Sequence, residues 1–230
     1  MVKENSISVV VPALNEAGGI AAMLKRLDGL RARGGEVILV DGGSTDGTLE
    51  QASCHVDRVV QSAPGRARQM NVGAAAARGD ILWFLHADTL ASPDADRLIL
   101  AALARRRRWG RFDVRLSGRH PLLRLVERMM NLRSRLSGIA TGDQGIFVSR
   151  DLFESLGGFP EQPLMEDIEI CRRLRRASGW PACLSPPLVT SSRRWETAGV
   201  VRTILLMWGL RLAYFCGVPA HRLAARYRRV

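Results

Sequence analysis

Two short apolar segments that end near an aspartate constrain the fold of this chain most strongly. Residues 36–40 are followed at once by Asp41, and residues 81–85 are followed three positions later by Asp88. Apolar runs of this length, bounded by glycine and polar residues, are typical of buried strands in a parallel sheet. Ligands bind at the carboxyl ends of such strands. We therefore expect both carboxylates to lie on one ligand-binding edge.

Helical periodicity alternates with these strands along the chain. We expect strands at residues 7–11, 36–40, 56–60, 81–85, 111–117 and 145–148. We expect helices at residues 20–30, 48–53, 65–78, 93–107, 122–136 and 167–177. Strands that alternate with helices predict right-handed βαβ units. The fold class is therefore α/β, with a mostly parallel central sheet flanked by helices.

The charge balance favours an anionic partner. The chain has 34 Lys and Arg against 22 Asp and Glu, a formal net charge of +12. A nucleotide diphosphate, acidic lipid headgroups and nucleic acid all suit this charge, and a solvated basic surface explains it equally well. Nucleic acid is the weakest of these partners. The sequence has no helix-turn-helix or zinc-finger spacing, and only two Tyr and six Phe for base stacking.

The cysteines and the first residues predict a cytoplasmic protein. Cys54, Cys171, Cys183 and Cys216 are far apart and form no CxxC pair, so neither a zinc ribbon nor a disulfide framework is indicated. Residues 1–6 run directly into the first expected strand and lack the apolar region of a signal peptide.

The last apolar segment, residues 200–218, contains Arg202, Gly209 and Arg211. Each arginine near the centre of a bilayer costs about 2.5–3.5 kcal/mol, so a spanning helix is disfavoured. Packing on the domain or on a second copy of the chain, and an amphipathic helix at a membrane interface, remain open. The basic residues that follow favour the membrane, at its inner face. We expect a main domain over residues 1–198 and a helical extension over residues 199–230.

Five motifs occur in order along the chain, with the sequences VPALNE (11–16), DGGSTDG (41–47), GRARQMNVG (65–73), LHAD (85–88) and MED (165–167). Together they resemble the family 2 glycosyltransferases, which have the nucleotide-diphospho-sugar transferase (GT-A) fold. The segments GDQG (142–145) and RRWE (193–196) resemble those of a short bacterial branch of that family.

The resemblance implies a nucleotide site made of Pro12, Ala13, Asn15, Glu16, Asp41, Arg66, Arg68 and Asp88. Asp41 would accept a hydrogen bond from the base or the ribose, although aspartate also favours turns. Arg66 and Arg68 open a helix and would meet the diphosphate as charged donors, although a solvated helix face is the usual place for arginine.

The resemblance also implies a divalent cation, Mn²⁺ or Mg²⁺. Asp88 matches the second aspartate of the family's Asp-x-Asp motif, and His86 replaces the first. Carboxylate and phosphate oxygens suit these ions. Three roles remain open for the His86 imidazole: metal ligand, hydrogen-bond partner of the ribose, and support for Asp88.

Asp167 is the candidate general base, and Glu166 is its neighbour and substitute. A carboxylate at this position would take the proton from the acceptor hydroxyl as that oxygen attacks the sugar. A helix-capping role is the structural alternative for both residues. On the acceptor or diphosphate side the resemblance places Gly142, Asp143, Gln144, Arg193, Arg194 and Trp195.

We therefore expect an inverting hexosyltransferase that uses a nucleotide-diphosphate sugar, with uridine favoured by the resemblance. The basic and apolar C-terminus favours a lipid or membrane-adjacent acceptor. One alternative is a sugar-phosphate nucleotidyltransferase, although that class would carry a glycine-rich loop with a lysine where this chain has PALNE (12–16). Another is a non-catalytic, nucleotide-binding module at a membrane.

Overall fold

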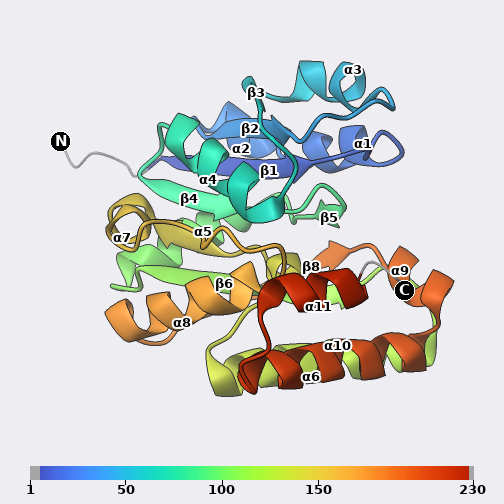
Figure 1. The fold of residues 1–230 in the computed structure, drawn as a ribbon. Helices are drawn as coiled ribbons and strands as arrows, with labels where there is room; N and C mark the ends of the chain where they lie inside the picture. The colour runs from blue at the N-terminus through green and yellow to red at the C-terminus, as the bar shows by residue number, and fades with distance from the viewer. Residues whose placement is uncertain (1–5, 228–230) are drawn as a thin grey trace.

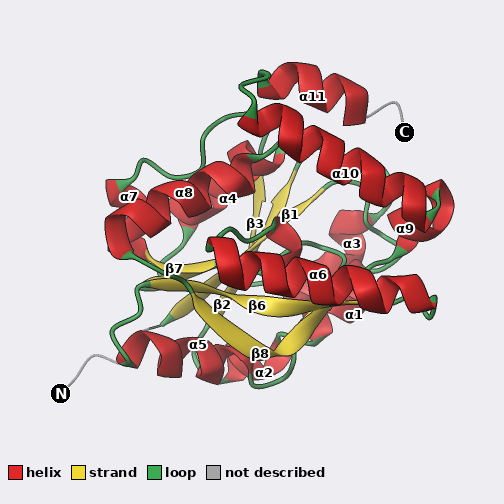
Figure 2. Ribbon diagram, turned by 90° about the horizontal axis from the view of Figure 1, so that it is seen from below, coloured by secondary structure: helices red, strands yellow, loops and turns green. Residues whose placement is uncertain are grey.

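A computed structural model describes residues 6–227. Outside the described residues lie residues 1–5, where the sequence lacks the apolar region of a signal peptide, and Arg228 and Arg229 of the basic tail. The described residues form an eight-stranded sheet in the order β3-β2-β1-β4-β7-β6-β8-β5, with helices packed on its two faces (Figures 1 and 2). The predicted α/β fold, a central sheet flanked by helices, is confirmed.

The strands are β1 (Ile7–Ala13), β2 (Glu36–Asp41), β3 (Arg58–Gln61), β4 (Ile81–Phe84), β5 (Thr89–Leu90), β6 (Trp109–Leu116), β7 (Phe147–Ser149) and β8 (Ala182–Thr190). The α-helices are α1 (Ile20–Lys25), α2 (Asp28–Ala32), α3 (Thr48–Ala52), α4 (Arg66–Ala76), α5 (Ala95–Ala104), α6 (Pro121–Ser137), α7 (Arg150–Ser155), α8 (Glu166–Ser178), α9 (Arg193–Ala198), α10 (Val200–Phe215) and α11 (Ala220–Tyr227). Two short 3₁₀ turns are η1 (Ser53–His55) and η2 (Gly142–Gln144).

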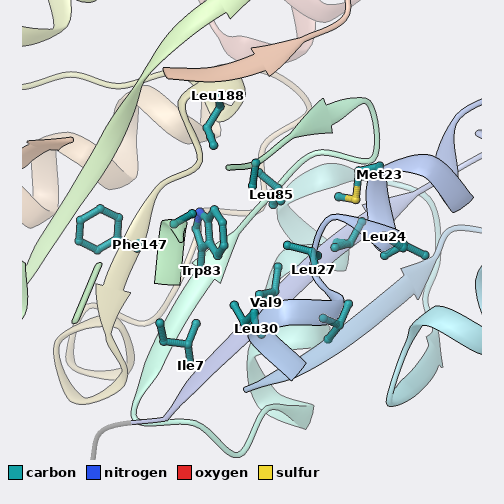
Figure 3. Packing of buried hydrophobic residues seen from close by; sticks show 14 of the residues in the cluster. Ile7, Val9, Met23, Leu24, Leu27, Leu30, Trp83, Leu85, Phe147 and Leu188 are labelled. Carbon is teal, nitrogen blue, oxygen red and sulfur yellow. The ribbon is translucent and has the colours of Figure 1, made fainter. Parts of the chain in front are cut away.

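The first four strands pair in parallel, as the apolar runs predict. In the register, Val10 of β1 lies opposite Ile38 of β2 and Phe84 of β4. Successive strand residues point to opposite faces. Val9 therefore packs into one buried cluster with α1, α2 and α5, and Val10 packs into another with α4 and α8. Figure 3 shows the first cluster.

The helix predicted at residues 20–30 is in fact two helices. The N–H groups of Arg26 and Leu27 bond to the carbonyls of Met23 and Leu24, three residues back, so the α-helical pattern is interrupted between α1 and α2. The apolar side chains nevertheless keep their common face, and Met23, Leu24 and Leu27 all remain buried.

The second half of the sheet is mixed. Strand β7 is antiparallel to β4 and β6, and β8 is parallel to β6. The sequence pattern did not predict β8, because Pro186 and Pro187 lie within it and proline lacks the N–H that a strand donates. Its pairing with β6 accordingly has a register shift between Phe112 and Val114. Strand β5 and helices α7 and α9 were also not predicted, whereas α10 and α11 lie within the segment expected to be helical, residues 199–230.

The C-terminal helices lie against the rest of the described chain. Helix α10 runs along α6 (Figure 1), and Ile204 of α10 packs against the buried cluster that contains Leu123 and Val126 of α6. Leu210 and Leu223 are buried in the same cluster as β4 and α8. The expected boundary at residue 198 falls beside Gly199, between α9 and α10. Among residues 6–227, no helix combines the length and apolar character that crossing a bilayer requires.

Candidate active site

A cleft of about 540 Å³ opens beside the carboxyl ends of β1 and β4. Its walls come from the loops after these strands and from α4, α6, η2, α8, α9 and α10. Eleven of the residues predicted from sequence line it: Glu16, Arg66, His86, Asp88, Gly142, Asp143, Glu166, Asp167, Arg193, Arg194 and Trp195. The fold thus gathers donor-side, metal-side and acceptor-side candidates around a single cavity.

Asp167 is fixed at the start of α8. Met165 precedes the helix with a left-handed backbone, φ 66°, and so turns the chain abruptly into α8. Oδ2 of Asp167 accepts a 3.1 Å hydrogen bond from the N–H of Gly142, and Oδ1 accepts one of 2.7 Å from the N–H of Ile168. The carboxylate is therefore oriented by main-chain donors while it lines the cleft.

His86 meets Asp143, a partner that the sequence did not suggest. Its Nδ1 lies 3.2 Å from Oδ1 of Asp143. On the other side of the ring, a Cβ added to Gly142 would lie 2.3 Å from Nε2. Burial opposes the ionisation of Asp143. Hydrogen bonding to His86, together with the positive charges of His86, Arg66 and Arg211, outweighs burial and holds the pKa of Asp143 below its ordinary value.

The pKa of Glu166 is shifted in the opposite direction from that of Asp143. Its side chain is buried, and both burial and the charge of Asp167 raise its pKa, against the opposing charges of Arg66 and His86. Two adjacent carboxyls in different environments can take different protonation states. Ionisation of Glu166 is therefore less favourable than that of an exposed glutamate, and the role of Asp167 as general base stays a prediction.

The donor set fits a divalent cation held mainly by Asp88. The Asp88 carboxylate lines the cleft, and its Oδ1 accepts a long 3.4 Å hydrogen bond from Oγ1 of Thr89. The part of the chain that the structure describes contains no group of three acidic, His or Cys side chains able to enclose a metal. Mg²⁺ and Mn²⁺ need no such cage, because they bind through one or two carboxylates and the substrate phosphates. The imidazole of His86 faces the carboxylate of Asp143 rather than that of Asp88.

The loops after β1 and β2 are joined by hydrogen bonds outside the cleft. The N–H of Asn15 donates to Oγ of Ser44, and Oδ1 of Asn15 accepts from the N–H of Thr45, both at 2.9 Å. Asp41 is buried and accepts from the N–H groups of Gly43 and Ser44 at 3.0–3.2 Å. Asp41 therefore shapes its own turn, and its contact with a nucleobase stays a prediction.

Other predicted residues also lie outside the cavity. Pro12 and Ala13 are buried at the end of β1. Arg68 points to Glu161, at 3.5 Å, on the exposed side of α4. Gln144 is fully buried, and its Oε1 accepts from the N–H of Thr141 at 3.1 Å, so it supports the η2 turn.

The cleft contains two arginines that sequence reasoning did not assign to a site, Arg133 of α6 and Arg211 of α10. Burial and the charge of Arg211 lower the pKa of Arg133 to about 10, although Asp167 opposes this. Burial also lowers the pKa of Arg211, against the charges of Asp167 and Asp143. For Arg211 the available signal was an arginine inside the apolar helix α10, where burial of an unpaired charge is costly. Arg133 gives no such signal, because α6 carries four arginines.

Comparisons with known proteins agree on the family. The family model described as "Glycosyl transferase family 2" matches residues 8–155. An uncharacterized glycosyltransferase of Mycobacterium tuberculosis is 37% identical over 110 residues, which cover 45% of this chain and 42% of the relative. Beta-monoglucosyldiacylglycerol synthase of a Nostoc species is 26% identical over 228 residues, covering 89% of this chain and 47% of the relative. The chain thus spans less than half of these relatives' lengths.

Solved structures show the same fold. Glucosyl-3-phosphoglycerate synthase from Mycobacterium tuberculosis, crystallised with Mn²⁺ and UDP, superposes with a TM-score of 0.66 at 23% identity, over 94% of this chain and 81% of that one. TarS of S. aureus in complex with UDP superposes with a TM-score of 0.65 at 22% identity, over 81% of this chain and 60% of that one. The family match, together with the cleft at the strand ends, shows that this chain is a member of glycosyl transferase family 2 with the GT-A fold.

Proposed function

We propose that this enzyme transfers a sugar from a UDP-sugar to a hydroxyl group of a lipid acceptor, with inversion at the anomeric carbon. The observation that carries the proposal is the placement of Asp88 and Asp167 in one cleft. Asp88 follows β4, and Asp167 begins α8. One carboxylate is thereby available for the donor, and the other for the acceptor.

On the donor side, Asp88 and Arg66 would face the diphosphate. Arg66 is the first residue of α4 and has no carboxylate within ion-pair distance among the described residues. A bound Mn²⁺ or Mg²⁺ at Asp88 would supply charge stabilisation for the leaving diphosphate. The Mn²⁺ and UDP complexes of the structural neighbours support this assignment.

On the acceptor side, Asp167 would remove the proton of the attacking hydroxyl. Its two oxygens accept main-chain hydrogen bonds at 3.1 and 2.7 Å, so the carboxylate cannot swing away from the cleft without losing both. The hydroxyl oxygen then forms its bond to C1 as the bond from C1 to the diphosphate breaks on the opposite side. A single displacement of this kind inverts the configuration of C1.

A lipid acceptor is favoured by the mouth of the cleft. Leu125 and Met129 of α6 and Trp208 of α10 line the cavity and are also 40–57% exposed at their outer side. Further exposed apolar residues extend this face along both helices: Leu132, Leu136, Leu205, Leu212 and Phe215. We name these eight residues the apolar face. One relative's name, Beta-monoglucosyldiacylglycerol synthase, also refers to a lipid.

The apolar face would contact the membrane at its inner surface. It is flanked by Arg128 and Arg135 on α6 and by Arg202 on α10, and α10 has no acidic residue. Apolar side chains with flanking cations bind anionic lipid surfaces.

The variant Leu212→Glu/Phe215→Glu should therefore bind phosphatidylglycerol vesicles less than wild type in a sedimentation assay. Val59→Glu, at an exposed position on β3, is the control. Unchanged vesicle binding, or a dimer that dissociates in the double variant, would contradict membrane contact.

The central test is transfer of radiolabelled sugar from UDP-glucose and UDP-N-acetylglucosamine to a panel of lipid hydroxyl acceptors. Asp167→Asn should lower kcat by about 10²–10⁴-fold, because it removes the base, while UDP affinity stays within twofold. An Asp167→Asn enzyme that keeps full activity would remove Asp167 from the mechanism. NMR of the product gives the anomeric configuration, and retention would contradict the single displacement.

A further inference from the structure

Arg133 and Arg211 form a basic pair at the side of the cleft bounded by α6 and α10. Both line the cavity. Nε and Nη2 of Arg133 are fully buried and have no hydrogen-bond partner. Within residues 6–227, neither arginine lies within ion-pair distance of a carboxylate. A buried, unpaired guanidinium donor costs free energy, so its retention points to a ligand that supplies acceptor oxygens.

This pair is distinct from the basic groups on the donor side. The charge of Arg66 acts on Asp143, Glu166 and Arg194. Arg133 and Arg211 come from α6 and α10 rather than from α4. The charge of Arg211 acts on Arg133 and, like that of Arg66, on Asp143, and the charge of Asp167 acts on both arginines of the pair. The pair therefore lies beside the proposed base, on the side from which the acceptor hydroxyl would come.

The chemistry of the pair suits a phosphate. Two guanidinium groups offer several N–H donors in planar geometry, which match the oxygens of a phosphate in a bidentate manner. They also repel each other, and an anion with more than one negative charge would relieve that repulsion. The apolar residues Met130 and Leu210 line the same cavity, so water competes poorly for the pair.

We infer that Arg133 and Arg211 bind a phosphate group carried by the acceptor, which holds the acceptor hydroxyl near Asp167. The inference rests on the proposed function and deepens it, because it limits the acceptors to phosphate esters. A lipid headgroup and a water-soluble phosphate ester would present the same group to the pair. The mouth of the cleft, with Leu125 and Trp208, favours the lipid.

Isothermal titration calorimetry of the full chain tests the inference at constant ionic strength. The probes are inorganic phosphate, glycerol 3-phosphate and short-chain phosphatidic acid. Glycerol serves as the uncharged comparison, and glycerate as the comparison that carries a carboxylate in place of the phosphate. Arg133→Gln and Arg211→Gln should each weaken binding of glycerol 3-phosphate by about tenfold, since each removes one charged donor group. Tighter binding of phosphatidic acid than of glycerol 3-phosphate indicates the lipid source, and the reverse order indicates the soluble one.

Matched controls are available on two other helices. Arg97 of α5 and Arg176 of α8 are exposed and do not line the cleft. Arg97→Gln and Arg176→Gln should therefore bind the phosphate probes within twofold of wild type. If Arg133→Gln fails to fold, Arg211→Gln and Arg211→Met still test the pair. Their melting temperatures without ligand should not fall, because removal of one charge relieves a buried repulsion.

Three outcomes would overturn the inference. The first is that wild-type protein fails to bind phosphate and glycerol 3-phosphate. The second is that the variants bind these probes as tightly as the controls do. The third is that the variants lose affinity for UDP with Mn²⁺ in parallel with phosphate, which would place the pair in the donor site. Wild-type protein that binds phosphate but not UDP would contradict the proposed donor instead, so the two failures are distinguishable.

Discussion

The main-chain N–H of Gly142 donates a 3.1 Å hydrogen bond to Oδ2 of Asp167, while its Cα lies against the imidazole of His86. One glycine thus joins three elements: the loop after β4, the η2 turn and the start of α8. Any side chain here would separate the histidine from the turn. The position of the proposed base therefore depends on the absence of a Cβ at residue 142.

The variant Gly142→Ala tests this dependence. The new Cβ would lie 2.3 Å from Nε2 of His86, so the ring or the turn must move. We expect a loss of about 1–3 kcal/mol in the free energy of unfolding, measured by urea denaturation, and a lower kcat. Gly209→Ala on α10 is the control, because no atom lies within 4 Å of its added Cβ. That change should leave stability equal or raise it by up to about 1 kcal/mol. Equal stability of the two variants would contradict the close packing.

Glu166 predicts a pH-dependent effect on stability. Burial and the charge of Asp167 raise its pKa in the folded protein. As the pH rises above the ordinary pKa of glutamate, the unfolded chain loses its proton more readily, so the wild type loses stability relative to Glu166→Gln. The difference in melting temperature between Glu166→Gln and wild type should therefore increase from pH 4 to pH 8. A difference that shrinks over this range would show that the folded pKa is not raised.

Asp143 predicts the opposite dependence. Its side chain is partly exposed, and the contact with His86 together with the nearby positive charges outweighs desolvation and holds its pKa below the ordinary value. Its contribution to stability is thus present above the pKa of the unfolded chain and is lost as the pH falls through the folded pKa. Asp143→Asn should be less stable than wild type at pH 6, and the gap should narrow toward pH 3. A gap that stays constant in thermal denaturation would mean that the carboxylate charge has no part in the contact.

Gln69 joins α4 to the ends of two strands. Its Nε2 donates to the carbonyls of Ala13 and Val40, both at 2.9 Å, and the side chain is buried. Gln69→Leu keeps the approximate size but leaves buried carbonyl groups without this donor. We expect a loss of about 1–3 kcal/mol in the free energy of unfolding by urea denaturation. Gln51→Leu on the exposed side of α3 is the control, and an equally small effect at both positions would contradict the structural role.

The sequence predicted those parts of the fold that depend on local pattern. Strands β1, β2 and β4 are buried on both faces, so they appear as continuous apolar runs. Strand β8 gives no such signal, since only part of it is buried and Pro186 and Pro187 interrupt it. The polar ends of the predictable strands likewise indicated where Asp88 would lie.

The contacts within the site depend on tertiary structure. His86 and Asp143 are 57 residues apart in sequence, and no local pattern around either residue predicts that the two side chains meet. Arg133 and Arg211 come from two helices whose relative placement follows from packing of Ile204 against the buried cluster that contains Val126. Periodicity predicts each helix, but it does not predict which arginine turns inward.

The most direct measurement is a thermal-shift panel of UDP, GDP, CDP, ADP and TDP, each with and without Mn²⁺, on wild-type protein and on Asp88→Ala. A ligand at a hundred times its dissociation constant stabilises the folded state by about 2.7 kcal/mol, which is readily detected. We expect UDP with Mn²⁺ to raise the melting temperature of the wild type, and we expect this effect to be lost in Asp88→Ala. An equal shift in both proteins, or no shift with any nucleotide, would contradict the donor site at Asp88.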